Sequence, residues 1–168
     1  MNVFRSLMVL SAVVLVACAG AAPPARLPAA EALTVTNGVR AFMSTVADGV
    51  TRRGPAAWQD YFEDTPAFFM ASEGRMVFEN ADAATQGIKE LTKSIAHIAL
   101  RWGDPLRVDP LTSTLAMVAA PYHEDLTDAG GHQVVEDGYF TALAELGPKG
   151  WRFRNAHWSV ATSPPVVR

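Results

Sequence analysis

Apolar residues recur at helical spacing in the first third of the chain. They follow one another at intervals of four, three, four and four, in the order Val35, Val39, Phe42, Val46 and Val50. This spacing places them in one stripe along an α-helix. Asn37-Gly38 weakens the start of that helix, so we expect it to begin near there. Gly54-Pro55 ends it, and Pro55 suits the first turn of a short second helix that carries Trp58 and Phe62 on one face.

The pattern changes to short strands and then returns to helix. Two apolar runs, 67–71 and 76–78, are joined through Ser72-Glu73-Gly74-Arg75 and predict a hairpin. Asn80 or Asp82 then caps a third helix. The apolar stripe of that helix is Ile88, Leu91, Ile95 and Ile98, and it should give way to strand around 97–100.

The second half of the chain reads as four strands, at about 98–109, 114–126, 132–146 and 150–160. Turn residues separate them, at Thr112-Ser113, Asp128-Ala129-Gly130-Gly131 and Gly147-Pro148-Lys149-Gly150. The sequence therefore predicts an α+β fold. Three helices from the N-terminal half are expected to pack on an antiparallel sheet of about six strands.

Loop symmetry gives a first register for these strands. If 147–150 and 128–131 are symmetric loops, Phe140 lies opposite His157, and His123 lies opposite Glu136. A fold-back at Thr112 places Asp104 beside Ala119. Alternation along the strands then sorts the side chains into two faces. We expect the inner face to include Leu100, Trp102, Met117, Ala119, Val134, Phe140, Ala142, Trp151 and Phe153, and the outer face to include Arg101, Val118, Tyr122, Glu124, Asp137, Tyr139, Leu143 and Trp158.

Composition and charge limit the classes of protein. The 168 residues are 49% hydrophobic and 18% charged, which is typical of one globular domain. The formal net charge is −3, so the chain lacks the basic excess that holds nucleic acid.

The chain begins with a targeting signal. Arg5 precedes an apolar run, 7–17, that is too short to span a bilayer and fits a signal peptide. The run ends Leu15-Val16-Ala17-Cys18, which resembles the lipobox of bacterial lipoproteins. We expect Cys18, the one cysteine of the chain, to be lipidated. Ordinary secretion with cleavage near Ala19-Gly20-Ala21-Ala22 is the alternative.

The predicted organisation follows from these signals. It is a signal peptide at 1–17, an Ala/Pro-rich tether at 18–30, one domain at 31–162 and a disordered tail at 163–168. The protein is expected to be exported to the periplasm or cell envelope. By resemblance to lipoprotein sorting in bacteria with two membranes, Ala19 after the cysteine favours the outer membrane.

The closing segment, Gly150-Trp151-Arg152-Phe153-Arg154-Asn155-Ala156-His157-Trp158-Ser159, resembles the nuclear transport factor 2-like superfamily, in its SnoaL-like and ketosteroid-isomerase-like group. Segment 69–75 resembles the first hairpin of that group and segment 138–141 its penultimate strand, and the likeness covers roughly 33–161. The resemblance implies a cone-shaped roll, in which a curved sheet wraps on the long helix and encloses a conical pocket. Members of the group often form a dimer through the outer face of the sheet. Members include isomerases, dehydratases, cyclases, epoxide hydrolases and non-catalytic binders, so the fold does not choose a function.

Four residues are candidates for chemistry. His123 and Glu136, cross-strand neighbours on the inner face, would form a general base with its orienting carboxylate, or a salt bridge at the wet rim. Asp104 would be a base with a raised pKa in an apolar pocket, or would turn outward at an edge bulge in Gly103-Asp104-Pro105. The resemblance places Tyr61 as a pocket hydrogen-bond donor, and ordinary packing is the alternative.

Four others are candidate ligand contacts. His157 would face the ligand or be a buried structural histidine. Trp102, Phe140 and Gly138 would wall a pocket, unless helix residues fill it. The four histidines, His97, His123, His132 and His157, lack metal-ligand spacing, and the chain has no phosphate-binding loop or Gly-x-Ser-x-Gly elbow. We therefore expect no metal and no cofactor.

Three functions remain open at this point. The first is an anchored binder of a small apolar or amphipathic molecule. The second is an enzyme of the isomerase, dehydratase or cyclase type that uses a pocket carboxylate or histidine as base. The third is a structural dimerisation domain. The expected partners are a small-molecule ligand, a second copy of the chain bound through Tyr122, Tyr139 and Trp158, and a membrane reached through the lipid anchor alone.

Overall fold

The computed structural model describes residues 26–160, so the predicted signal peptide, Cys18 and the tail at 163–168 lie outside the described residues. The elements follow in the order α1 (Ala29–Arg53), η1, a 3-10 helix (Pro55–Asp60), β1 (Phe69–Ser72), β2 (Arg75–Phe78), α2 (Ala81–Ser94), β3 (Ile95–Trp102), β4 (Arg107–Thr112), β5 (Leu115–Asp128), β6 (Gln133–Gly147) and β7 (Gly150–Val160). The α+β prediction is confirmed. The sheet formed by the described residues has seven strands rather than about six, because the predicted strand 98–109 is divided into β3 and β4.

Helix α1 starts earlier than its sequence suggested. It begins at Ala29, directly after Pro28, and passes through Asn37-Gly38 without interruption. A glycine is needed there because a Cβ on Gly38 would lie 2.9 Å from Nε1 of Trp151. The predicted apolar stripe from Val35 to Val50 is buried, and Gly54, with a φ of 70°, ends the helix. None of the helices among the described residues is both long and apolar enough to cross a bilayer.

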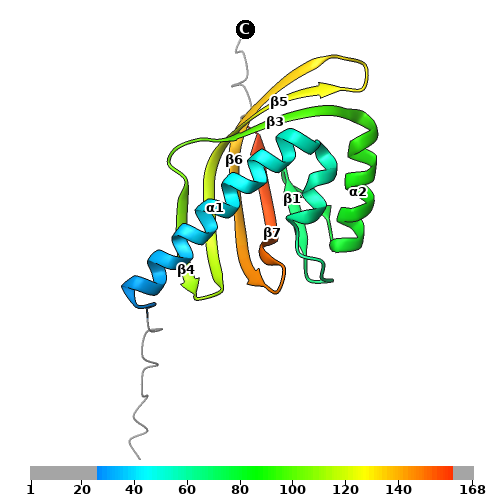
Figure 1. The fold of residues 1–168 in the computed structure, drawn as a ribbon. Coiled ribbons are helices and arrows are strands. Elements are labelled where there is room, and N and C mark those ends of the chain that lie inside the picture. Colours follow the sequence, from blue (N-terminus) through cyan, green and yellow to red (C-terminus); the bar gives the residue numbers. More distant parts are fainter. Residues whose placement is uncertain (1–25, 161–168) are drawn as a thin grey trace, which may run out of the picture.

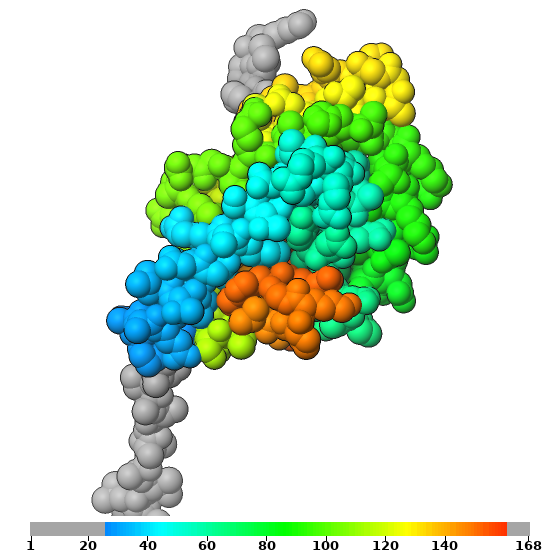
Figure 2. Space-filling view, viewed as in Figure 1, coloured from blue at the N-terminus to red at the C-terminus, as the bar shows by residue number. Residues whose placement is uncertain are grey.

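The strands lie in the order β2-β1-β7-β6-β5-β3, with β4 also paired to β5. Figure 1 shows α1 lying diagonally across the concave face of this sheet, with α2 standing beside it at the other end of the strands. The long β5–β6 hairpin extends past α1 toward α2 (Figure 1). The space-filling view in Figure 2 shows α1 and the cyan-to-green segments that follow it lying side by side, with the β6–β7 turn (orange) visible beside them.

The register of β5 differs by one residue from the prediction. The β5–β6 loop holds three residues rather than four: the backbone N–H of Asp128 donates to the carbonyl of His132 at 2.9 Å, and Gly131 takes a φ of 87°. Such a loop closes with a glycine in the left-handed region. Glu124 therefore pairs with Glu136, and His123 pairs with Asp137. Because side chains alternate along a strand, the whole inner face of β5 is exchanged with its outer face.

A second correction lies in β7. Leu146 pairs with Trp151 as predicted, but a bulge at Arg154 shifts the pairing beyond it. Phe140 consequently lies opposite Trp158, and His157 lies opposite Thr141. The bulge turns Trp158 toward the inner face and His157 toward the outer face.

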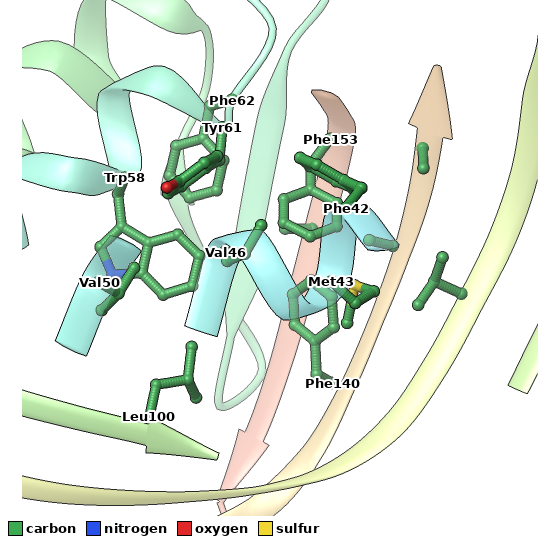
Figure 3. Packing of buried hydrophobic residues seen from close by; sticks show 14 of the residues in the cluster. Phe42, Met43, Val46, Val50, Trp58, Tyr61, Phe62, Leu100, Phe140 and Phe153 are labelled. Carbon is green, nitrogen blue, oxygen red and sulfur yellow. The ribbon is translucent and has the colours of Figure 1, made fainter. Parts of the chain in front are cut away.

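Aromatic side chains fill the space between α1 and the sheet. Figure 3 shows Phe42 and Met43 of α1 facing Phe140 and Phe153 of the sheet. The ring centroids of Phe42 and Phe153 are 4.8 Å apart, and those of Phe140 and Phe153 are 5.1 Å apart. Small residues on the neighbouring strand, Ala116 and Ala120 of β5, are fully buried beneath these rings. This half of the cone is a packed core.

Candidate functional site

A cavity of about 280 Å³ lies at the other half of the cone, between α2 and the inner face of the sheet. Its walls combine side chains from η1, α2, β1, β3 and the sheet centre. The apolar lining residues are Trp58, Phe62, Met70, Ile88, Leu91, Ile95, Ile98, Leu126 and Trp158, and the charged ones are Glu124 and Glu136. We call this the α2 pocket. Its volume lies just below the usual range of ligand sites, about 300–1,000 Å³, so it suits a small molecule.

The sheet register brings the two carboxylates together. Glu124 of β5 and Glu136 of β6 are directly paired residues, so their side chains leave the same face of the sheet side by side. Glu124 is only 9% exposed. None of the side-chain hydrogen bonds or ion pairs among the described residues involves either carboxylate. The acidic side chains that do take part in such contacts are Asp60, Glu90, Asp125, Asp128, Asp137 and Glu145, and the amide acceptors are Asn80 and Asn155.

Burial controls the protonation of this pair. Removal from water raises the pKa of the Glu124 carboxyl to about 7, and the negative charge of Glu136 adds to that effect. Burial also raises the pKa of Glu136, with a further contribution from Glu73 in the β1–β2 turn. Glu124 therefore titrates near neutral pH and can either donate or accept a proton there.

Tyr122 lies one inward position before Glu124 on β5. Its side chain is 3% exposed, and its hydroxyl has no hydrogen-bond partner among the described residues. Burial, followed by the charges of Glu136 and Glu124, raises the pKa of this phenol. The ring lies over Gly138, where a Cβ would come within 2.7 Å of it. Gly138, predicted to line a ligand site, thus makes room for Tyr122 instead.

Of the predicted catalytic residues, Glu136 lines the pocket and the other three do not. His123 lies on the outer face, where Nδ1 is 2.7 Å from Oδ1 of Asp137 and Nε2 is 3.3 Å from Oδ1 of Asp125. These contacts, with that of Asp137 the larger, raise the pKa of His123. The predicted His123–Glu136 pair is therefore wrong, because the one-residue register difference gives the histidine another partner.

Asp104 and Tyr61 take the alternatives that the sequence left open. Asp104 is exposed in the segment between β3 and β4, so its inward placement is wrong. Tyr61 is buried against Gly49; its hydroxyl donates to the carbonyl of Thr45 at 3.1 Å and accepts from Nη2 of Arg53 at 3.2 Å. With those bonds made, the phenol serves packing and faces α1 rather than the α2 pocket.

The predicted ligand contacts are also placed differently. His157 is exposed on the outer face, so its inward placement is wrong. Trp102 donates from Nε1 to the carbonyl of Met43 at 2.8 Å, and its ring lies 5.0 Å from that of Phe140. Both rings belong to the packed core under α1, where helix residues fill the space that the sequence allowed for a ligand.

The predicted dimer patch is divided between the two faces. Tyr122 is buried on the inner face and Trp158 lines the α2 pocket, so placing them on the outer face is wrong. Tyr139 does lie on the outer face, as predicted, and is exposed together with Met117 and Val135. A dimer through this face stays a prediction, with these residues at its centre.

A second cavity, of about 270 Å³, lies where η1, the start of α2 and the β6–β7 loop meet. Its acidic residues, Asp60, Glu63 and Asp64, stand beside the basic Lys149 and Arg152. These charges are partly or fully exposed, so water screens them and they make a weak case for a binding site. In residues 26–160, no three or more His, Cys, Asp or Glu side chains converge as metal ligands do.

Sequence reasoning missed Glu124, which it placed on the outer face. Both alternating sets of β5 are apolar over 115–122, so hydrophobicity does not choose the inner face. The available signal was the loop Asp128-Ala129-Gly130-Gly131-His132. If the loop has three residues, its last residue is Gly131, which suits the positive φ needed there. A loop of this length gives the register that the structure shows.

Comparison with solved structures defines the class of fold. The chain is similar to a putative scytalone dehydratase from Novosphingobium aromaticivorans, with a TM-score of 0.68 and 10% identity over 83% of this chain and 93% of that one. It is also similar to the hexachlorocyclohexane dehydrochlorinase LinA-type3 from Novosphingobium barchaimii, with a TM-score of 0.62 and 12% identity over 83% and 96%. A nuclear transport factor 2-like protein from Salmonella enterica gives 0.61 and 13% over 82% and 95%.

The chain has the nuclear transport factor 2-like fold, as its sequence predicted. No family model matches its sequence, and no curated protein does. Proteins of this fold include dehydratases and dehydrochlorinases as well as binders, so the function has to be argued from the α2 pocket.

Proposed function

We propose that this protein binds a small, largely apolar molecule in the α2 pocket. The observation that carries the proposal is a cavity of about 280 Å³ with apolar walls and a paired, uncompensated carboxylate at one side. Cavities of this kind, mostly apolar with a few convergent polar groups, are the usual form of a small-molecule site. If side chains had filled the α2 pocket, the third alternative, a structural dimerisation domain, would have been favoured instead.

The first test is occupancy of the pocket. Native mass spectrometry of the protein purified after expression of the full chain should reveal a co-purifying small molecule. Leu91→Trp should prevent its retention, because the larger side chain from α2 occupies the cavity. Leu111→Trp is the matched control, since Leu111 is exposed on β4, outside the pocket. Equal retention by both variants would place the ligand elsewhere and contradict the proposal.

An enzyme that moves a proton is the second candidate function. The observation in its favour is that burial raises the pKa of Glu124 to about 7, which suits a general base or acid at neutral pH. Glu124 would take a proton from carbon in an isomerisation or elimination, and the reaction would occur between the apolar walls of the pocket.

Deuterium exchange tests this second candidate. Phenylacetone, a small enolisable ketone, should incorporate deuterium faster with the protein in heavy water than without it. Glu124→Gln should reduce the enzymatic rate by at least tenfold while leaving the fold intact. Glu145→Gln, on the outer face of β6, is the control. If Glu124→Gln exchanges at the unmodified rate, Glu124 is not the base.

Export and anchoring belong to the same proposal. The support is the apolar run at 7–17 followed by Leu15-Val16-Ala17-Cys18, and an Ala/Pro-rich stretch before the domain. Cys18→Ala should release the protein from the membrane fraction into the soluble exported fraction. Unchanged membrane association of Cys18→Ala would contradict lipidation.

A further inference from the structure

We infer that the molecule bound in the α2 pocket carries a positively charged nitrogen on an apolar body. This inference rests on the proposed function, because it names the class of ligand for the same pocket. The charges of the pocket, the isolation of its buried carboxylate and the aromatic walls support it independently.

The charged groups that line the pocket are all acidic. Glu124 and Glu136 are the charged lining residues, and Glu73 in the β1–β2 turn adds a third negative charge close to Glu136. The lining residues contributed by η1, α2, β3 and β7 are uncharged. Since two neighbouring carboxylates repel each other and a third charge of the same sign would add to this, an anionic ligand is disfavoured.

The deeper carboxylate has no counterion within the protein. Glu124 is 9% exposed and lines the cavity, yet none of the hydrogen bonds or ion pairs between described side chains involves it. A buried charge without a partner is costly, and a carboxylate so placed avoids the cost by holding its proton. An ammonium group in the pocket would supply the missing partner and allow Glu124 to ionise.

The aromatic lining residues of the pocket are suited to a cation as well. Trp58, Phe62 and Trp158 all line the cavity. The rings of Trp58 and Phe62 are stacked with centroids 5.5 Å apart, and the ring of Trp158 meets Trp58 edge-on at 5.3 Å. The faces of indole and phenyl rings attract ammonium groups, and tryptophan does so most strongly. Carboxylates and aromatic rings that line one cavity together suit an alkylammonium with an apolar body.

Three probes of nearly equal size separate the possibilities: benzylamine, benzyl alcohol and benzoate, titrated by ligand-observed NMR. Ligands this small bind weakly, in about the millimolar range. We expect benzylamine to bind at least tenfold more tightly than benzyl alcohol, and benzoate to bind most weakly. Leu91→Trp should abolish binding of all three and so reports pocket occupancy.

Substitutions of single glutamates show which carboxylates cause the preference for benzylamine. Glu124→Gln and Glu136→Gln should each weaken benzylamine at least tenfold and leave benzyl alcohol within about twofold, whereas Glu145→Gln should change neither. Benzylamine should also bind more tightly at pH 8 than at pH 6, because ionisation of Glu124 completes the pair while an alkylammonium stays protonated.

The outcomes distinguish the two proposals. If benzyl alcohol or benzoate binds as tightly as benzylamine and Leu91→Trp blocks it, the cationic ligand is wrong and the small-molecule pocket stands. If none of the three probes binds the unmodified protein, the cationic ligand is wrong, and the retention test with Leu91→Trp decides the small-molecule pocket separately.

Discussion

The inner face of one pair of strands serves two different regions of this protein. Toward one end of β5 and β6, Ala116, Phe140 and Ala144 are completely buried beneath α1. Toward the other end, Glu124 and Glu136 of the same two strands border an open pocket beneath α2. Alternation along the strands is the same in both halves, so the strands themselves do not explain the difference.

The covering helices explain it. Helix α1 brings Phe42, Met43 and a row of valines onto the sheet, and aromatic rings from β6 and β7 meet them. Helix α2 brings Ile88 and Leu91, which with Ile98 of β3 leave about 280 Å³ unfilled. One sheet can therefore hold both a packed core and a pocket, because α1 fills the concave face that it lies on whereas α2 leaves space beneath it.

The largest expected effect is in the packed half. Phe140→Ala removes a fully buried ring that contacts Trp102, Phe153 and Trp158. We expect a loss of about 3–5 kcal/mol in the free energy of unfolding, since the surrounding rings cannot close the space. Denaturant unfolding measures it. Tyr139→Ala, its exposed neighbour on the outer face, should cost far less; equal losses would mean that the half beneath α1 is not the rigid one.

The second effect concerns the site half and depends on pH. The pKa of Glu124 is raised to about 7 in the folded protein, from an ordinary value near 4.5. The folded state then holds the proton more tightly than the unfolded chain, so stability falls as the pH rises from about 4.5 to 7. The unmodified protein should lose about 2–3 kcal/mol across this range relative to Glu124→Gln. Parallel pH profiles for the two proteins would show that Glu124 titrates normally.

Two glycines, one in each half, allow a finer comparison of how tightly the two halves are packed. A Cβ on Gly49 would overlap the Tyr61 hydroxyl, whose bonds to Thr45 and Arg53 hold it in place. Gly49→Ala should therefore cost about 1–3 kcal/mol. In α2 a Cβ on Gly87 would meet the end of the Phe78 ring, which is partly exposed and can rotate away.

Gly87→Ala should accordingly be nearly neutral, because a gain of about 1 kcal/mol in helix propensity offsets the displacement of Phe78. Thermal unfolding of the two variants under identical conditions makes the comparison. A loss for Gly87→Ala as large as that for Gly49→Ala would contradict the view that the α2 side is the looser half.

The smallest effect on stability is expected on the outer face, where the consequence is assembly. Met117, Val135 and Tyr139 are exposed there, on two adjacent strands. We predict a homodimer through this face. Met117→Glu should convert it to monomers in sedimentation experiments and change the stability of the isolated protomer by no more than about 0.5 kcal/mol. If the unmodified protein is already a monomer at about tens of micromolar, where a standard-size interface should hold, the predicted dimer is wrong.

Much of the fold could be predicted from the sequence because its signals are local. The stripe from Val35 to Val50, the cap at Asn80, whose side chain accepts from the backbone N–H of Ala83 at 2.9 Å, and the Gly147–Gly150 turn all act within a few residues. The site was predicted less well. Glu136 was assigned correctly to the inner face, whereas the placements of His123, Asp104 and His157 depended on register and were wrong.

The reason is that a register difference of one residue reverses a whole strand. One fewer residue in the β5–β6 loop exchanged His123 for Glu124 at the pocket, and the bulge at Arg154 exchanged His157 for Trp158. Both alternating sets of residues on β5 are apolar enough to be buried, so the sequence of that strand does not choose between them.

The sequence by itself determined the type and order of the elements, the apolar faces of α1 and α2 and the acidic character of the chain, because periodicity, caps and composition are properties of neighbouring residues. The tertiary structure decided which carboxylates face one another and which are removed from water. Glu124 and Glu136 are twelve positions apart in the chain, and their pairing depends on how β5 and β6 align. The raised pKa of Glu124 then arises from the walls that α2, η1 and β3 build around it, since desolvation is a property of the assembled pocket.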